Sequence, residues 1–420
     1  MKIKRFTEEV LDEFKARANS HQTHFEDLVL LGRDGLEELN DKIDKFIRRL
    51  ESNTNELNMT TKIDGAPAVV CWSKFEGYPD NSICLKSFLI SNKNCLSSVD
   101  DIENKYGDRP DMATKLKYCL EIAKYIPSGQ AWQGDCLYSS NDLREVEIDG
   151  TKYLTFHPNK IVYAFSEDNP TYETIKNSDF GICFHTIYTG NLEHKSQSFN
   201  IDVSVLQGVP NNIYIMSPAL DIPTEKSEYS LDKVLELYGQ LKQVEDKLNS
   251  DPAYEELVNN SAFMGYWNTF ENANLSDKQA VNLNTDTIID DLRDYIRDKK
   301  QKEFDKKEFK TDIGREKATN KLQSDLIELD SLLNDKKVVL YNMVNGLNLA
   351  ADIKMLLWSG LKKSKQNYNT YYLHKDRGYI PASMEGVALS DQDGNIVKIV
   401  DRSSFSNVNR DSNYLSGFEH

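Results

Sequence analysis

Long apolar runs are missing from this chain, and their absence limits where it can reside. No stretch approaches the roughly 20 apolar residues that a membrane helix requires. The opening "MKIKRFTEEVLDEF" also has no apolar core of the kind found in signal peptides. We therefore expect a cytoplasmic protein with no membrane partner.

Cysteines are few, and they are not spaced like metal ligands. None of the six forms a C-x-x-C pair, and several lie inside apolar runs typical of strands. Zinc sites usually contain such closely spaced pairs, and disulfides are rare in cytosolic proteins. The pattern predicts reduced, buried thiols at Cys71, Cys84, Cys95, Cys119, Cys136 and Cys183.

Positive charge is in deficit, because 51 Lys and Arg face 67 Asp and Glu and leave a formal charge of −16. Nucleic acid would be repelled unless basic residues gather locally. Residues 361–377 combine cations that suit phosphates with rings that suit unpaired bases. An ordinary helix-to-strand connection would have a similar composition. The candidate nucleic-acid contacts are Lys362, Lys363, Lys365, Tyr368, Tyr371, Lys375 and Arg377.

The 420 residues suffice for two or three domains, and their patterning changes along the chain. Residues 1–60 have helical periodicity, whereas residues 61–224 contain short β-rich runs around one helix at 111–126. Amphipathic helices return over 225–365. Strand patterning resumes over 366–420, with a hairpin whose turn is "DQDGN". We predict an antiparallel-rich α+β core that follows an N-terminal helical segment and is interrupted by a large α-helical insertion.

A lysine and an aspartate stand two residues apart in "TTKIDGAPAVVCW", just before an apolar run. Alone, the K-x-D-G pattern is weak, because four residues recur by chance and lysines often flank strands. It is followed in order by "QGDCLY" (133–138), "GICFHTIY" (181–188), "MEGVAL" (384–389) and "IVKIV" (396–400). The five motifs in this order indicate a function more specifically than any one of them does alone.

This ordered set resembles the covalent nucleotidyltransferase superfamily of polynucleotide ligases and capping enzymes, over about residues 60–205 and 380–402. The run that begins at Gln133 is also similar to ligase-like proteins of tailed phages. The resemblance implies a ligase adenylation domain. By analogy it also implies a phage enzyme that repairs RNA in the host cytoplasm.

The resemblance makes Lys62 the nucleophile that forms a lysyl-AMP intermediate. An amine attacks phosphorus only when unprotonated, and desolvation with nearby cations lowers the usual lysine pKa of about 10.4. Asp64 would orient Lys62 or hold a metal, and Gly65 would let the backbone approach the nucleotide. Lys398 would contact the α-phosphate, and Glu385 would act through Mg²⁺ or Mn²⁺.

Four further nucleotide contacts follow from the same resemblance. Lys86 would contact a phosphate, Asp135 would accept hydrogen bonds from ribose hydroxyls, and Phe184 would stack on the base. Arg402 would compensate for Val400, which stands where relatives often have the second lysine of a K-x-K motif. Solvation of a strand end would equally explain Lys86, and core packing would explain Phe184.

DNA ligases and capping enzymes usually carry an OB-fold after the last motif, and residues 399–420 are too few for one. RNA ligases commonly lack it. The resemblance therefore favours an ATP-dependent RNA ligase that joins a 5′-phosphate to a 3′-hydroxyl, with RNA favoured over DNA. No residue selects adenine over guanine. Two alternatives stay open: transfer of AMP or GMP to an acceptor that is not nucleic acid, and a nucleotide- or RNA-binding protein without turnover.

Overall fold

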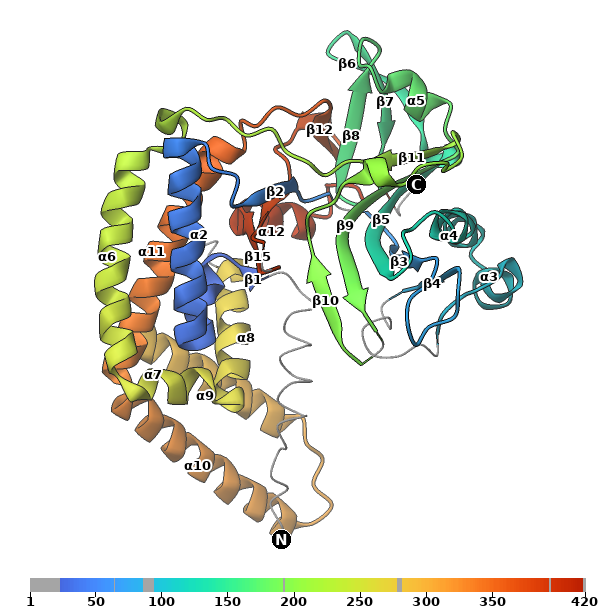
Figure 1. Ribbon diagram of the computed structural model, residues 1–420. Helices are drawn as coiled ribbons and strands as arrows, with labels where there is room; N and C mark the ends of the chain where they lie inside the picture. Colours follow the sequence, from blue (N-terminus) through green and yellow to red (C-terminus); the bar gives the residue numbers. More distant parts are fainter. Residues whose placement is uncertain are drawn as a thin grey trace. The chain divides into compact units, whose positions relative to one another are not determined.

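The computed structural model describes residues 23–63, 65–85, 94–191, 193–277, 282–392 and 394–417. These residues form two compact units, each built from separate stretches of the chain (Figure 1). Of the described residues, the helical unit draws on those within 23–52, 225–359 and 401–407, and the β-rich unit draws on those within 53–224, 360–400 and 408–417. The predicted mixed α+β class is confirmed.

The helical unit contains α2 (Gly32–Ser52), whose apolar residues recur at helical spacing and are buried along one stripe. The neighbouring α6 (Leu231–Ser250) is joined to it by a hydrogen bond of 2.7 Å from Asn40 Nδ2 to Glu245 Oε2. The remaining elements of the unit are β1 (Thr23–His24), η1 (Glu26–Leu31), η4 (Lys226–Tyr229), α7 (Pro252–Val258), α8 (Ser261–Asp277), α9 (Ile288–Asp305), α10 (Asp312–Asp335), α11 (Lys337–Leu361) and the first turns of α12 (Arg402–Arg410).

The largest sheet of the β-rich unit has the order β10-β9-β5-β3-β4, and β11 pairs with β9. All of these pairings are antiparallel except the one between β11 and β9. The strands are β3 (Ala68–Trp72), β4 (Ser82–Cys84), β5 (Gln130–Ser139), β9 (Phe180–Gly190), β10 (Lys195–Ser198) and β11 (Ile213–Met216).

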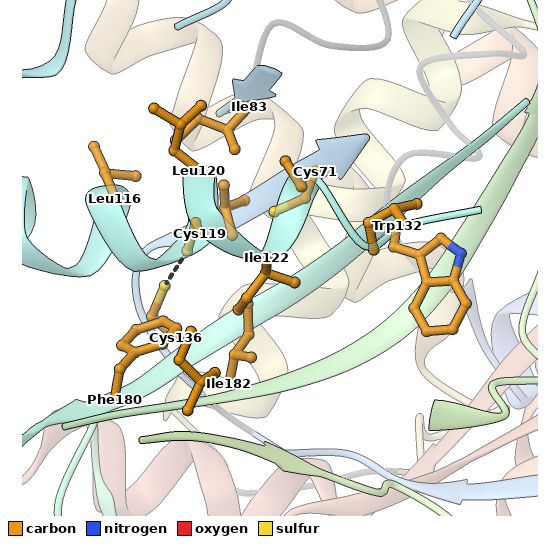
Figure 2. Close-up of a cluster of buried hydrophobic side chains, with 14 of the residues drawn as sticks. Cys71, Ile83, Leu116, Cys119, Leu120, Ile122, Trp132, Cys136, Phe180 and Ile182 are labelled. Atoms are coloured by element: carbon orange, nitrogen blue, oxygen red, sulfur yellow. Dashed lines mark hydrogen bonds between the residues drawn. The ribbon is translucent and has the colours of Figure 1, made fainter. Parts of the chain in front are cut away.

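One face of this sheet is covered by α4 (Pro110–Ala123), which confirms the helix predicted at 111–126. Leu116, Cys119 and Ile122 on α4 pack against Cys71, Trp132, Cys136 and Ile182 of the strands (Figure 2). The helix α3 (Val99–Tyr106) lies beside α4 and begins at a capping box made by Ser98 and Asp101. The opposite face of the sheet is not covered by α4.

Two further sheets of this unit join segments that are far apart in the sequence. In one, β14 (Gly386–Ser390) pairs with both β2 (Asn58–Thr61) and β15 (Ile396–Val400), and the antiparallel β14–β15 pair confirms the two strands of the predicted hairpin. In the other, the order is β13-β12-β8-β7-β6, so that β12 of the C-terminal part pairs with β8. Its strands are β6 (Arg144–Ile148), β7 (Thr151–Phe156), β8 (Ile161–Ser166), β12 (Asn369–His374) and β13 (Gly378–Pro381).

Short elements complete the β-rich unit, namely η2 (Ser140–Asp142), α5 (Tyr172–Lys176) and η3 (Val203–Val205). In the part of the chain that the structure describes, no helix is both long enough and apolar enough to cross a membrane.

Candidate active site

Lys62 lies one residue beyond β2, where the strand pairing with β14 continues. Its backbone N–H donates a hydrogen bond of 2.8 Å to the carbonyl oxygen of Gly386. The next residue, Ile63, is buried in a hydrophobic cluster and anchors the chain there. The position of the Lys62 backbone is therefore determined by a strand on one side and a buried side chain on the other.

The turn after Lys62 lies directly against β5. A Cβ atom on Gly65 would lie 2.6 Å from the carbonyl oxygen of Cys136 and 2.9 Å from Cβ of Asp135, so only glycine fits without a shift. The N–H of Ala66 donates to the Cys136 oxygen at 2.8 Å, and the N–H of Cys136 donates to the Pro67 oxygen at 3.1 Å. Asp64, the other predicted site residue of the K-x-D-G motif, lies outside the described residues.

The side chain of Lys62 forms an ion pair with the carboxylate of Glu385, the residue just before β14. The two residues are 323 positions apart in the sequence. The Lys62 side chain is 30% exposed, whereas that of Glu385 is only 2% exposed. A nearly buried carboxylate thus holds a cation that solvent and ligands can still reach.

Lys398 lies on the same small sheet as Lys62. It pairs with Ala388 on β14, and Ala388 pairs with Thr60 on β2. Side chains two residues apart on a strand point to the same face, so Lys62 and Lys398 share one face of this sheet. Lys398 is half-buried. The structure therefore brings together two lysines and one carboxylate of the predicted site.

Asp135 and His185 meet on the face of the largest sheet that α4 does not cover. The distance from Asp135 Oδ2 to His185 Nε2 is 3.8 Å. Burial, together with the positive charge of Lys62, lowers the pKa of His185 to about 4, so that the imidazole is neutral near pH 7. Its Nδ1 lies 2.8 Å from the hydroxyl oxygen of Thr186. A neutral ring thus lies close to both Lys62 and Asp135.

A β-bulge explains why His185, and not Phe184, has this position. The β5–β9 register shifts between Gln133 and Gly134. Gln133 pairs with Thr186 and Gly134 pairs with Phe184, so His185 is the extra, unpaired residue of β9. Phe184 points to the opposite face, is fully buried, and meets Trp132 edge-to-face at 5.6 Å. The expectation that Phe184 stacks on a base does not fit this position, since its ring is enclosed by the core under α4.

Arg402 has a different environment from the predicted phosphate contact. It belongs to the helical unit, where Nη1 lies 2.8 Å from Glu271 Oε1, 2.9 Å from Asp27 Oδ1 and 3.4 Å from Glu26 Oε1. Lys354 forms an ion pair with the same Glu26. All three acidic side chains contact Nη1 of this guanidinium within the helical unit, a position that does not fit the predicted phosphate contact.

The predicted nucleic-acid segment separates into exposed cations and packed rings. Tyr368 packs against Tyr163 and Phe165, each at 5.6 Å between ring centroids, and burial raises its pKa. Tyr368 itself is half-buried, whereas Tyr371 is buried and lies edge-to-face with Tyr153 at 6.0 Å. Base stacking by these two rings is therefore not supported. The exposed members are Lys362, Lys363, Lys365, Lys375 and Arg377.

Sequence reasoning left two residues of the site unassigned, His185 and Gln133. Gln133 points to the same face as Asp135, because the two residues are two positions apart on β5. Its Oε1 accepts a hydrogen bond of 2.6 Å from the hydroxyl of Tyr188. Alternation along "WQGDCLY" would have indicated Gln133, whereas nothing in the sequence indicates the bulge at His185. Lys86 lies outside the described residues.

Comparison with known proteins gives a family without an assigned function. Residues 19–413 match the model of a family of unknown function, DUF6267, and the chain belongs to that family. No curated protein and no solved structure matches the chain.

Proposed function

We propose, since membership of this family assigns no activity, that the protein is an ATP-dependent polynucleotide ligase that acts on RNA through a lysyl-AMP intermediate. The observation that carries the proposal is the ion pair between Lys62 and the nearly buried Glu385. The two residues come from motifs that lie 323 positions apart in the sequence. Lys398 lies on the same face of their sheet.

In the first step, the amine of Lys62 attacks the α-phosphorus of ATP. A nitrogen–phosphorus bond forms, the bond between phosphorus and the leaving pyrophosphate oxygen breaks, and the proton that the amine loses passes to solvent water. Before nucleotide binds, Glu385 neutralises and orients the Lys62 ammonium. Movement of Glu385 toward the nucleotide would remove this counter-ion and favour the neutral amine. The positive charge of Lys398 would stabilise the negative charge that develops on the α-phosphate.

The residues of the site fit a divalent metal of the kind that accompanies a nucleotide. Mg²⁺ is usually held by one or two carboxylates together with substrate phosphates. Within the described ranges no group of three or more His, Cys, Asp or Glu forms a metal site, whereas Glu385 offers a single buried carboxylate beside Lys62. Glu385 would hold Mg²⁺ or Mn²⁺ with the phosphates, and the metal would supply charge neutralisation.

The nucleoside would lie over β5 and β9, on the face of the sheet that α4 does not cover. Asp135 can accept hydrogen bonds from ribose hydroxyls, as a carboxylate often does. The neutral ring of His185 lies beside it, so His185 takes the base-stacking role that was expected of Phe184. No described contact distinguishes adenine from guanine.

In the later steps AMP passes from Lys62 to a 5′-phosphate, and attack by a 3′-hydroxyl joins the strands and releases AMP. The exposed cations of residues 362–377 support an RNA partner, because they can neutralise backbone phosphates on an otherwise acidic protein.

Incubation with α-³²P-labelled ATP or GTP and Mg²⁺, followed by a denaturing gel, tests the first step. Label is expected on the wild type and on a Lys74→Ala control, whose lysine is exposed in the same unit. Label is not expected on Lys62→Ala or on Lys62→Arg, which keeps the positive charge. Absence of label with both nucleotides would overturn the proposal, and label on both Lys62 variants would refute the assigned nucleophile.

The acceptor is tested by adding 5′-phosphorylated RNA or DNA to the labelled protein. Transfer of label to RNA, followed by strand joining, is the expected result. Label that forms but never moves to either polynucleotide would refute the ligase and favour an acceptor of another class.

A further inference from the structure

Cys84 and Cys95 lie opposite each other on two adjacent extended segments. Their neighbours Ile83 and Leu96 form an antiparallel bridge, with N–H to oxygen distances of 3.0 Å from Ile83 and 2.8 Å from Leu96. Because Ile83 and Leu96 exchange both hydrogen bonds, the next pair along is a non-hydrogen-bonded pair. In such pairs the Cα atoms approach to about 4.5 Å, which lies within the range spanned by disulfides.

The two thiols interact with each other, and one of them reaches solvent. A hydrogen bond with Cys84, and then burial, raises the pKa of Cys95, while the ammonium of Lys105 opposes this shift. Cys84 is buried and Cys95 is half-buried. Tyr78 packs in the same cluster, and its own pKa is raised by burial and by both thiols. The pair is therefore close enough to react and open to a small reagent on one side.

The pair also lies on the face of the sheet that carries the candidate active site. Cys84 pairs with Val70, which pairs with Gln133, so the three side chains form one row across β4, β3 and β5. Asp135 is two residues from Gln133 on the same face. In sequence, residues 84–95 also enclose Lys86, the predicted phosphate contact.

A second pair of cysteines provides an internal comparison. The Sγ atoms of Cys119 and Cys136 lie 3.6 Å apart in the core between α4 and β5 (Figure 2). Both residues are fully buried, and burial raises their pKa values well above the usual value. Short distance alone does not make this pair reactive, because no reagent reaches it in the folded protein.

We propose that Cys84 and Cys95 are a redox modification site that forms a reversible disulfide with a small disulfide such as oxidised glutathione. The Cys95 thiolate attacks one glutathione sulfur, a mixed disulfide forms, and one glutathione thiolate leaves. The Cys84 thiolate then attacks the Cys95 sulfur and displaces the second glutathione. The two cysteines lose two protons and two electrons, and one oxidised glutathione becomes two reduced ones.

The test treats the reduced full-length protein with oxidised glutathione at pH 7 and pH 8, quenches with acid, and measures intact mass and linked peptides. The expected product has lost two hydrogen atoms, links Cys84 to Cys95, and returns to the reduced mass with dithiothreitol. The rate should rise about tenfold between the two pH values, because the thiolate fraction does.

Three variants sharpen the result. Cys84→Ser should accumulate the mixed disulfide on Cys95, Cys95→Ser should remain unmodified, and Cys119→Ala should behave as the wild type. Formation of a Cys119–Cys136 link before any Cys84–Cys95 link, or no link in folded protein, would overturn the proposal. Neither outcome depends on ligase activity, because the readout is covalent mass.

Discussion

Replacing Lys62 by methionine removes the cation from its ion pair and leaves the Glu385 carboxylate nearly buried. Breaking a buried ion pair from one side typically costs about 3–5 kcal/mol. Because Lys62 is 30% exposed and water can enter the vacated space, we expect the low end, about 3 kcal/mol. Glu385→Gln should cost only about 1 kcal/mol, because solvent can still hydrate the Lys62 ammonium.

The double variant Lys62→Met/Glu385→Gln distinguishes the cost of a stranded charge from the cost of lost packing. It contains no buried charge at this position, so it should be about 2 kcal/mol more stable than Lys62→Met alone. The main expectation is that Lys62→Met is the least stable of the three variants. A general loss of packing would instead make the double variant the least stable of the three.

Urea unfolding followed by tryptophan fluorescence measures these differences, since Trp72 and Trp132 are buried in the β-rich unit. With a urea dependence of about 3 kcal/mol per molar, Lys62→Met should lower the midpoint by about 1 M. The exposed Lys74→Met provides a control that should shift stability by less than about 0.5 kcal/mol. If Glu385→Gln lost more stability than Lys62→Met, the reasoning from burial would be refuted.

Three other changes have defined outcomes. The lowered pKa of His185 means that the unfolded chain takes up a proton below about pH 6.5, whereas the folded chain does so only near pH 4. Stability should therefore fall as the pH is lowered from 6.5 to 4. In His185→Gln this fall should be smaller by about 1–2 kcal/mol at pH 5, as measured by urea titrations. Gly65→Ala should cost about 1–3 kcal/mol and reduce nucleotide labelling, because its Cβ would displace the Cys136 carbonyl. Burial, and then the charge of Glu271, raises the pKa of Asp27 to about 8, so the folded protein keeps a proton that the unfolded chain releases above about pH 4. Stability should therefore fall as pH rises toward 8, and thermal unfolding between pH 6 and 9 should show a smaller fall in Asp27→Asn.

Periodicity was sufficient to predict the elements that have one clear apolar stripe or alternation. The stripe of α2, the helix α4 and the β14–β15 hairpin all follow from local spacing. Motif order additionally predicted that Lys62, Glu385 and Lys398 would be functional neighbours, and the pairing of β14 with β2 and β15 places them on adjoining strands. No local rule predicts that pairing, since it joins segments on either side of the helical stretch.

The aromatic and basic assignments needed information that alternation does not contain. One extra residue in β9 reverses which side chain points to the site, and a bulge has no distinct residue signature in "GICFHTIY". Arg402 stands only four residues after Lys398, yet it contacts three acidic side chains of the helical unit. By composition Tyr368 and Tyr371 resemble surface rings, and only tertiary packing shows that Tyr371 is buried and that Tyr368 packs against core aromatic residues.

The pairing of Lys62 with Glu385 also has a consequence for biosynthesis. At about 5–20 residues per second, a ribosome would need roughly 16–65 seconds to travel the 323 positions between them. During that time β2 lacks β14, its partner from the C-terminal part, while the intervening helices are already being made. A prematurely terminated chain would therefore carry the lysine without its carboxylate, and only chains completed past β14 can assemble the reactive pair.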